Sequence, residues 1–103
     1  MLINMDTILE EIKKIDPEVN AEMWHTGGGC MTIYLGTPDQ DGMYPVAAGP
    51  GFVRDDQNVA HFDDFCFGVD GDGPFEYVQS GSDLEIARRI YSFYEYMNMH
   101  KES

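Results

Sequence analysis

The chain has 103 residues, 43% of them hydrophobic, and its 19 acidic and 6 basic residues give a formal net charge of −13. A chain of this length is expected to form a single compact domain, 1–103, with a modest core. The charge argues against direct binding to nucleic acid or to anionic membranes, because both repel an acidic surface, and it favours a basic partner.

The N-terminal segment predicts a short amphipathic helix over residues 6–16. Apolar residues recur at helical spacing from Ile8 to Ile15, Asn4 or Asp6 can serve as N-cap, and Pro17 ends the segment. The first residues lack the basic start and apolar run of a signal peptide, and no stretch is apolar enough for a membrane span. We therefore expect a cytoplasmic protein.

From residue 21 to residue 79 the pattern predicts antiparallel strands joined by hairpins, because short alternating runs are separated by Gly, Pro and Asp. The predicted strands are 21–25, 30–35, 43–48, 65–69 and 75–79, with turns at 38–42 and 70–74. Pro45 favours a sheet edge for the third strand, since proline donates no ladder hydrogen bond. The path from Phe52 to His61 is not predicted.

The C-terminal segment predicts a helix over residues 83–99. Ser82 and Glu85 form a capping box, and Glu85 is spaced to pair with Arg89 on the outer face. The apolar stripe consists of Ile86, Ile90, Phe93 and Met97. The predicted fold class is therefore α+β: an N-terminal helix, a four- to five-stranded antiparallel meander and a C-terminal helix, with both helices on one sheet face.

The glycine hairpin is the most distinctive local string of the chain. Gly27, Gly28 and Gly29 separate His25 from Cys30, so the loop can present backbone N–H groups to a ligand and the two side chains can form a nucleophile and base pair. Few cations are near to lower the thiol pKa, and the Lys and Ser/Thr of a P-loop are missing. A turn whose glycines serve backbone geometry is the preferred interpretation.

Neither a metal site nor a cofactor is predicted. The run Asp70-Gly71-Asp72-Gly73 lacks the later ligands of a calcium loop and suits a hairpin turn, and His61 with Asp63 is too small a set for a zinc site. Cys30 and Cys66 lie between apolar residues and are expected to be reduced thiols.

The string Trp24-His25-Thr26-Gly27-Gly28-Gly29-Cys30-Met31, followed by an apolar strand and an Asp-Gly turn, resembles small uncharacterised proteins encoded by bacteriophages and related mobile elements. The resemblance covers this hairpin and loosely the order of helix, meander and helix, and it transfers no assigned activity. It implies a context, since small acidic phage proteins often block a host defence or host enzyme, some by presenting carboxylates as a mimic of DNA phosphates.

The preferred hypothesis is a non-enzymatic protein of a bacterial host's cytoplasm that binds and inhibits a basic, nucleic-acid-binding host protein, as an anti-CRISPR protein or other DNA mimic does. The predicted partner-binding carboxylates are Asp55, Asp56, Asp63, Asp64, Asp70, Asp72 and Glu76. An immunity protein against a basic toxin is one alternative, and a small enzyme or ligand-binding domain using His25 and Cys30 is another. Tyr91, Tyr94 and Met97 offer a surface for a homodimer.

Overall fold

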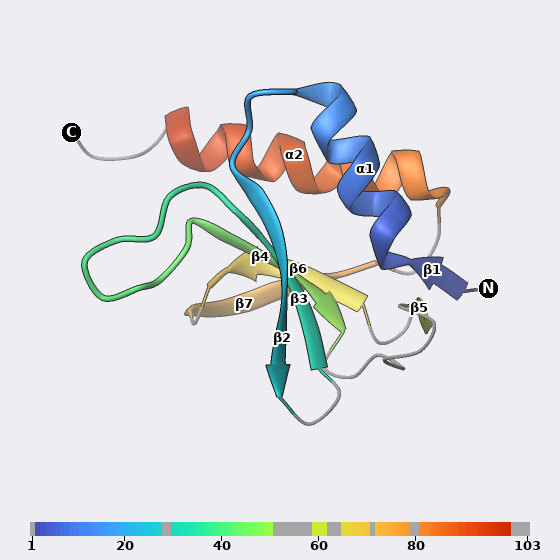
Figure 1. Ribbon diagram of the computed structural model, residues 1–103, viewed down its shortest axis with the longest axis horizontal. Coiled ribbons are helices and arrows are strands. Elements are labelled where there is room, and N and C mark those ends of the chain that lie inside the picture. Colours follow the sequence, from blue (N-terminus) through green and yellow to red (C-terminus); the bar gives the residue numbers. More distant parts are fainter. Residues whose placement is uncertain are drawn as a thin grey trace.

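The computed structural model describes residues 2–27, 30–50, 59–61, 65–70, 72–78 and 81–99 of the protein. In this part of the chain, two helices lie on one side of a five-stranded antiparallel sheet, and a small second sheet adjoins the start of the first helix (Figure 1). The structure thus confirms the predicted α+β fold, with a helix at each end of the meander.

Helix α1 (Met5–Ile15) forms where the apolar spacing predicts it. Asn4 is the N-cap, and its side chain accepts a hydrogen bond of 3.1 Å from the backbone N–H of Thr7. The C-cap is Asp16, directly before Pro17. Met5, Ile8 and Ile12 are fully buried, so the helix is held by its apolar stripe rather than by its own length.

The main sheet is an antiparallel meander with the strand order β2-β3-β4-β6-β7. Its strands are β2 (Ala21–Gly27), β3 (Cys30–Leu35), β4 (Val46–Pro50), β6 (Phe65–Val69) and β7 (Asp72–Tyr77). Strand β7 begins at Asp72 rather than at residue 75, so the turn predicted over 70–74 is shorter than expected. A bulge in the β6–β7 pairing accommodates this difference.

Strand β4 is central, and the edge position predicted from Pro45 is wrong. β4 pairs with β3 on one side and with β6 on the other. Pro45 lies just before the strand, so its missing N–H removes no hydrogen bond from either ladder. Its ring instead lies against Gly36 at the opposite end of the loop that joins β3 to β4.

A second, two-stranded antiparallel sheet pairs β1 (Leu2–Asn4) with β5 (Val59–His61). Neither strand is predicted from the sequence. Both are only three residues long, too short for an alternating pattern to stand out.

Helix α2 (Asp83–Met99) has the predicted bounds and the predicted capping box. The Ser82 hydroxyl accepts from the backbone N–H of Glu85 at 3.2 Å, and the Glu85 carboxylate accepts from the backbone N–H of Ser82 at 3.0 Å. The hydrogen bond from the Ser82 backbone N–H to the carboxylate, followed by one from the Ser82 side chain, lowers the pKa of Glu85. Because the Glu85 carboxylate is engaged at the cap, the predicted pair with Arg89 does not form, and Arg89 pairs with Glu76 of β7 instead.

The hydrophobic core lies between the two helices and the side of the main sheet that faces them. The helices contribute Ile8, Ile12, Ile86 and Ile90, and the strands contribute Ile33, Leu35, Val46, Ala48, Phe65 and Phe67. Alternate strand residues point away from the helices, and this other side of the sheet is called the open face below.

No helix in the described ranges has the length and apolar character that a membrane crossing requires.

Candidate functional site

The glycine hairpin joins β2 to β3. Gly27 pairs with Cys30, and the register shifts between His25 and Gly27, as at a bulge. Gly28 and Gly29 lie outside the described residues, and so do the side chains of His25 and Cys30. The structure therefore places His25 and Cys30 near the same end of two paired strands, and a contact between their side chains stays a prediction.

The predicted partner-binding carboxylates are only partly described. Outside the described residues lie Asp55, Asp56, Asp63 and Asp64. Asp72 is the first residue of β7 and pairs with Val69, while its side chain is not described. Only Asp70 and Glu76 are described with their side chains.

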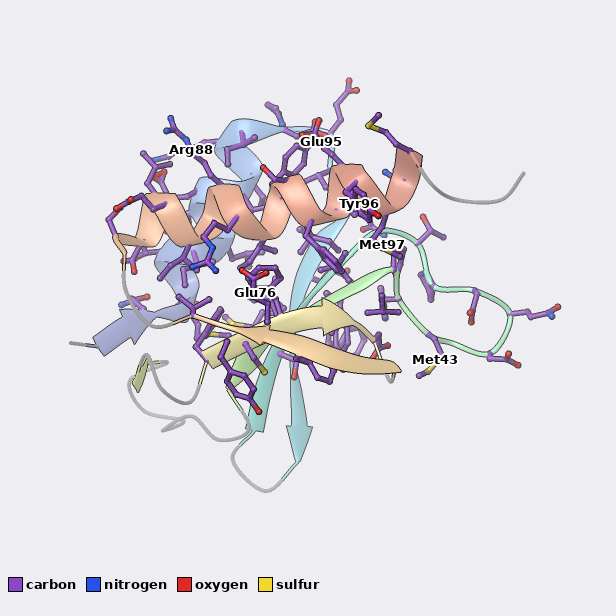
Figure 2. The ribbon with its side chains drawn as sticks, turned by 180° about the vertical axis from the view of Figure 1, so that it is seen from behind. Met43, Glu76, Arg88, Glu95, Tyr96 and Met97 are labelled. Atoms are coloured by element: carbon purple, nitrogen blue, oxygen red, sulfur yellow. The ribbon has the colours of Figure 1, made fainter. Side chains whose placement is uncertain are left out.

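Asp70 and Glu76 lie on opposite faces of the main sheet. Glu76 pairs across the ladder with the core residue Phe67, and its side chain lies between β7 and α2 (Figure 2). There it forms an ion pair with Arg89. Asp70 follows β6 on the open face and accepts a hydrogen bond of 3.0 Å from the backbone N–H of Tyr44. The two carboxylates do not share one surface, and both have a part in holding the fold.

The predicted dimer residues on α2 pack against the core of their own chain. Tyr91, Tyr94 and Met97 are all partly buried there, and the Tyr91 and Tyr94 rings lie 5.8 Å apart. Tyr96 and Met99 are more exposed, at 56% and 81%. The homodimer itself stays a prediction.

The open face of the main sheet has a shallow trough between aromatic walls. Two rows of paired residues cross it: Glu22, Tyr34, Ala47 and Gly68, then Gly49, Cys66 and Tyr77. The central strands β4 and β6 thus carry only small side chains on this face, whereas β3 carries Tyr34 and β7 carries Phe75 and Tyr77. Large side chains on β3 and β7, on either side of the small ones on β4 and β6, produce the trough.

A depression of about 220 Å³ lies in this trough. It is lined by Thr32, Tyr34, Ala47, Ala48, Gly49, Cys66, Asp70 and Phe75, and is called the aromatic pocket below. The Tyr34 ring is stacked on the Tyr44 ring, with centroids 4.5 Å apart, and the Asp70 carboxylate holds the backbone of Tyr44. Tyr44 of the loop between β3 and β4 therefore holds two residues of the pocket in place: Tyr34 through ring stacking and Asp70 through the backbone hydrogen bond.

The polar groups of the aromatic pocket are few and close together. Burial, and then the negative charge of Asp70, raises the pKa of the Tyr34 hydroxyl, while a hydrogen bond with the Thr32 side chain acts in the opposite direction. Tyr34 is therefore neutral at neutral pH. The pocket presents one carboxylate and two hydroxyl groups beside aromatic rings, an arrangement that accepts hydrogen bonds from a cation.

Cys66 lies on the floor of the aromatic pocket as a free thiol. Its Sγ lies 3.6 Å from the backbone oxygen of Gly49, to which the thiol donates. Burial raises the pKa of the Cys66 thiol, so it is protonated at neutral pH and is a poor nucleophile. The raised pKa therefore disfavours covalent reaction through the Cys66 thiol at neutral pH.

The aromatic pocket is not among the sites predicted from the sequence. A signal is nevertheless present in Phe65-Cys66-Phe67-Gly68, where large and small residues alternate, and in Ala47 and Gly49 of β4. Because successive strand residues point to opposite faces, these small residues indicate a face without large side chains at its centre.

Among the described residues, no three His, Cys, Asp or Glu side chains are grouped so that they could hold a metal ion. Comparison of the chain with models of protein families, with curated proteins and with solved structures finds no match.

Proposed function

We propose that this protein is a non-enzymatic interaction protein whose acidic surface binds a basic, nucleic-acid-binding protein and blocks its function. The observation that carries the proposal is the net charge of −13, combined with the absence of any buried charged side chain in the described part of the chain. The carboxylates there are on the surface, where they contribute to the electrostatic field that a partner meets.

Ion pairs within the described part of the chain leave the net charge unchanged, because that charge already counts every basic residue. Among the described residues, Lys14 pairs with Glu11 and Arg89 pairs with Glu76, so these two cations are already engaged by carboxylates of the same protein. A basic surface is the complementary partner, and nucleic-acid-binding proteins carry such surfaces because they must neutralise phosphates. Inhibition then follows if the carboxylates occupy the positions of the phosphates. The phage context of this proposal rests on the resemblance of the glycine hairpin.

The test is capture of partners on the immobilised protein from a bacterial lysate, at low and at high salt, with identification by mass spectrometry. We expect basic nucleic-acid-binding proteins to be enriched at low salt, to be lost at high salt and to be displaced by double-stranded DNA, because screened charges and a competing polyanion both weaken the contact. Retention of the same partners at high salt and in excess DNA would contradict the proposal.

A pair of double variants tests where the charge acts. Asp63→Lys with Asp64→Lys is expected to weaken capture without unfolding the protein, as checked by circular dichroism. Glu10→Lys with Glu18→Lys makes the same charge change at exposed positions of α1 and the segment after it. Equal losses in both double variants would indicate a nonspecific charge effect, and unchanged capture in both would reject the proposal. Cys30→Ala should leave capture unchanged, and its loss in that variant would favour a hairpin-based enzyme or ligand site instead.

A further inference from the structure

The aromatic pocket on the open face has features that the net charge does not require. We infer that it receives an arginine side chain of the basic partner, with the guanidinium against an aromatic wall and near the carboxylate of Asp70. The inference rests on the proposed function, which supplies the basic partner, and it adds the place on the surface and the residue type that is recognised.

The size of the pocket fits one side chain. Its volume is about 220 Å³. Sites for small organic ligands usually range from about 300 to 1,000 Å³ and enclose most of the ligand. This pocket is smaller and lies open in the sheet, and its floor of Ala47, Gly49 and Cys66 leaves room for a side chain that enters from outside.

The walls of the pocket suit a planar cation. Tyr34 forms one wall and is held in place by its stack on Tyr44. Phe75 also lines the pocket and is 39% exposed, so part of its ring can be reached by a partner. A guanidinium group stacks on such rings through cation–π attraction and planar contact, and it loses less hydration than an ammonium group does.

Asp70 supplies the charge and is already oriented. Its Oδ2 accepts the 3.0 Å bond from the backbone N–H of Tyr44, which fixes the carboxylate at the border of the pocket. A carboxylate has acceptor sites beyond the one used here, and guanidinium offers five donors in a flat fork. Thr32 and Tyr34 add hydroxyl oxygens within the same pocket. A lysine ammonium, being a strongly hydrated point charge, uses the rings and the fork geometry less well.

Further exposed aromatic rings and a carboxylate lie next to the pocket on the open face. Trp24 is 50% exposed, and its Nε1 donates a 3.2 Å hydrogen bond to the carboxylate of Glu22 on the same strand. Tyr77 is 60% exposed in the row that contains Cys66. Exposed rings beside carboxylates favour a partner segment that carries further basic residues next to the bound arginine.

The test is calorimetric titration of the full chain, at low salt, with a short peptide of alternating glycine and arginine and with the same peptide carrying lysine. We expect the arginine peptide to bind several-fold more tightly than the lysine peptide, and Asp70→Asn to weaken the arginine peptide about 10-fold, the size of one lost charge-assisted interaction. Asparagine retains an acceptor for the Tyr44 N–H, so the loop stays attached. The matched control is Asp41→Asn, an equal charge change at an exposed loop position.

A second measurement does not depend on any change of charge. Cys66 lines the pocket, so bound arginine peptide should slow the alkylation of Cys66 in a Cys30→Ala background at least several-fold, and the lysine peptide should protect it less. Ala47→Leu, which fills the floor of the pocket, should reduce arginine binding if the variant keeps its circular dichroism spectrum; the alkylation result stands even if that variant does not fold.

The outcomes separate this inference from the proposed function. The inferred arginine site is overturned by three results together: the two peptides bind equally, Asp70→Asn weakens the arginine peptide no more than Asp41→Asn does, and neither peptide protects Cys66. Peptide binding would then reflect a nonspecific acidic surface. If neither peptide binds but basic proteins are still captured in a salt-sensitive way, the arginine site is overturned and the proposed function is retained. If neither peptide binding nor salt-sensitive capture is observed, the arginine site and the proposed function are both overturned.

Discussion

The hydroxyl of Tyr91 in α2 donates a hydrogen bond of 2.7 Å to the carboxylate of Asp16, the C-cap of α1 and 75 residues earlier in the chain. The other carboxylate oxygen of Asp16 accepts from the backbone N–H of Glu18 at 3.0 Å. A carboxylate is unfavourable at a helix C-terminus because the negative end of the helix dipole lies there. The bond from Tyr91 offsets this cost and joins the two helices at the end of α1.

Replacing Tyr91 with phenylalanine tests this link between the helices. The hydrogen bond to Asp16, supported by burial, raises the pKa of Tyr91 to about 12. Tyr91→Phe should lower the free energy of unfolding by about 1 kcal/mol at neutral pH, as measured by urea titration. The difference should persist up to about pH 10, the pKa of tyrosine in an unfolded chain, and disappear as the pH rises through about 12. A difference that grows with pH over this range would contradict the assignment.

The loop between β3 and β4 depends on the absence of a side chain at Gly36. This residue has φ of 96°, and a Cβ there would lie 2.6 Å from Cγ of Pro45. Gly36→Ala should therefore combine backbone strain with a steric clash and destabilise the protein by about 2–3 kcal/mol.

The matched control for Gly36→Ala is Gly42→Ala. Gly42 has φ of 82°, but nothing lies within 4 Å of the added Cβ, so only backbone strain of about 1 kcal/mol is expected. The difference between the two variants in thermal or urea unfolding isolates the contact with Pro45. Equal destabilisation would show that this contact carries no cost.

The helices and the meander were predictable because their signals are local. The Ser82 to Glu85 capping box and the long apolar stripe behind it need no knowledge of the rest of the chain, and α2 has the predicted bounds. The position of β4 within the sheet was less accessible. Pro45 has the same sequence neighbours whether it lies in β4 or just before it, and only the pairing on both sides of β4 decides that the strand is central.

The candidate site was predicted less well than the fold, because it is made by registers between strands. Asp70 and Glu76 are close in the sequence, yet the β6–β7 bulge and the alternation of side chains place them on opposite faces of the sheet. The aromatic pocket combines residues of β3, β4, β6 and β7. Its charged residue, Asp70, is among the carboxylates predicted from the sequence, whereas the shape of the pocket depends on which strands are neighbours.

The capping box of α2 can be tested with a single substitution. Ser82→Ala removes the acceptor of the Glu85 N–H and should cost about 1 kcal/mol of stability. Ser92→Ala is the control, because Ser92 is an exposed serine inside the same helix, where alanine is the better helix former. Unfolding curves of the two variants should diverge in opposite directions from the parent protein. Equal stability of the two variants would contradict a role for the cap.

The raised pKa of the Cys66 thiol predicts slow reaction with alkylating reagents. In a Cys30→Ala background, the rate at neutral pH should be well below that of a free thiol, and it should rise with pH through a midpoint above the ordinary pKa of a thiol, because only the thiolate reacts. The same protein unfolded in urea is the control and should react as a free thiol does. A fast reaction of the folded protein at neutral pH would instead indicate an activated cysteine on the open face.

The net charge predicts that salt acts in opposite directions on stability and on partner binding. Self-repulsion among surface carboxylates is strongest where the screening length is about 30 Å, near 0.01 M salt, and it weakens where that length falls to about 8 Å, near 0.15 M. Sodium chloride should therefore raise the midpoint of thermal unfolding, by about 4–8 °C for each 1 kcal/mol gained in a domain of this size. The Glu10→Lys with Glu18→Lys variant carries less negative charge and should respond less. A midpoint that falls as salt is added would mean that favourable ion pairs, rather than repulsion among the carboxylates, dominate the surface.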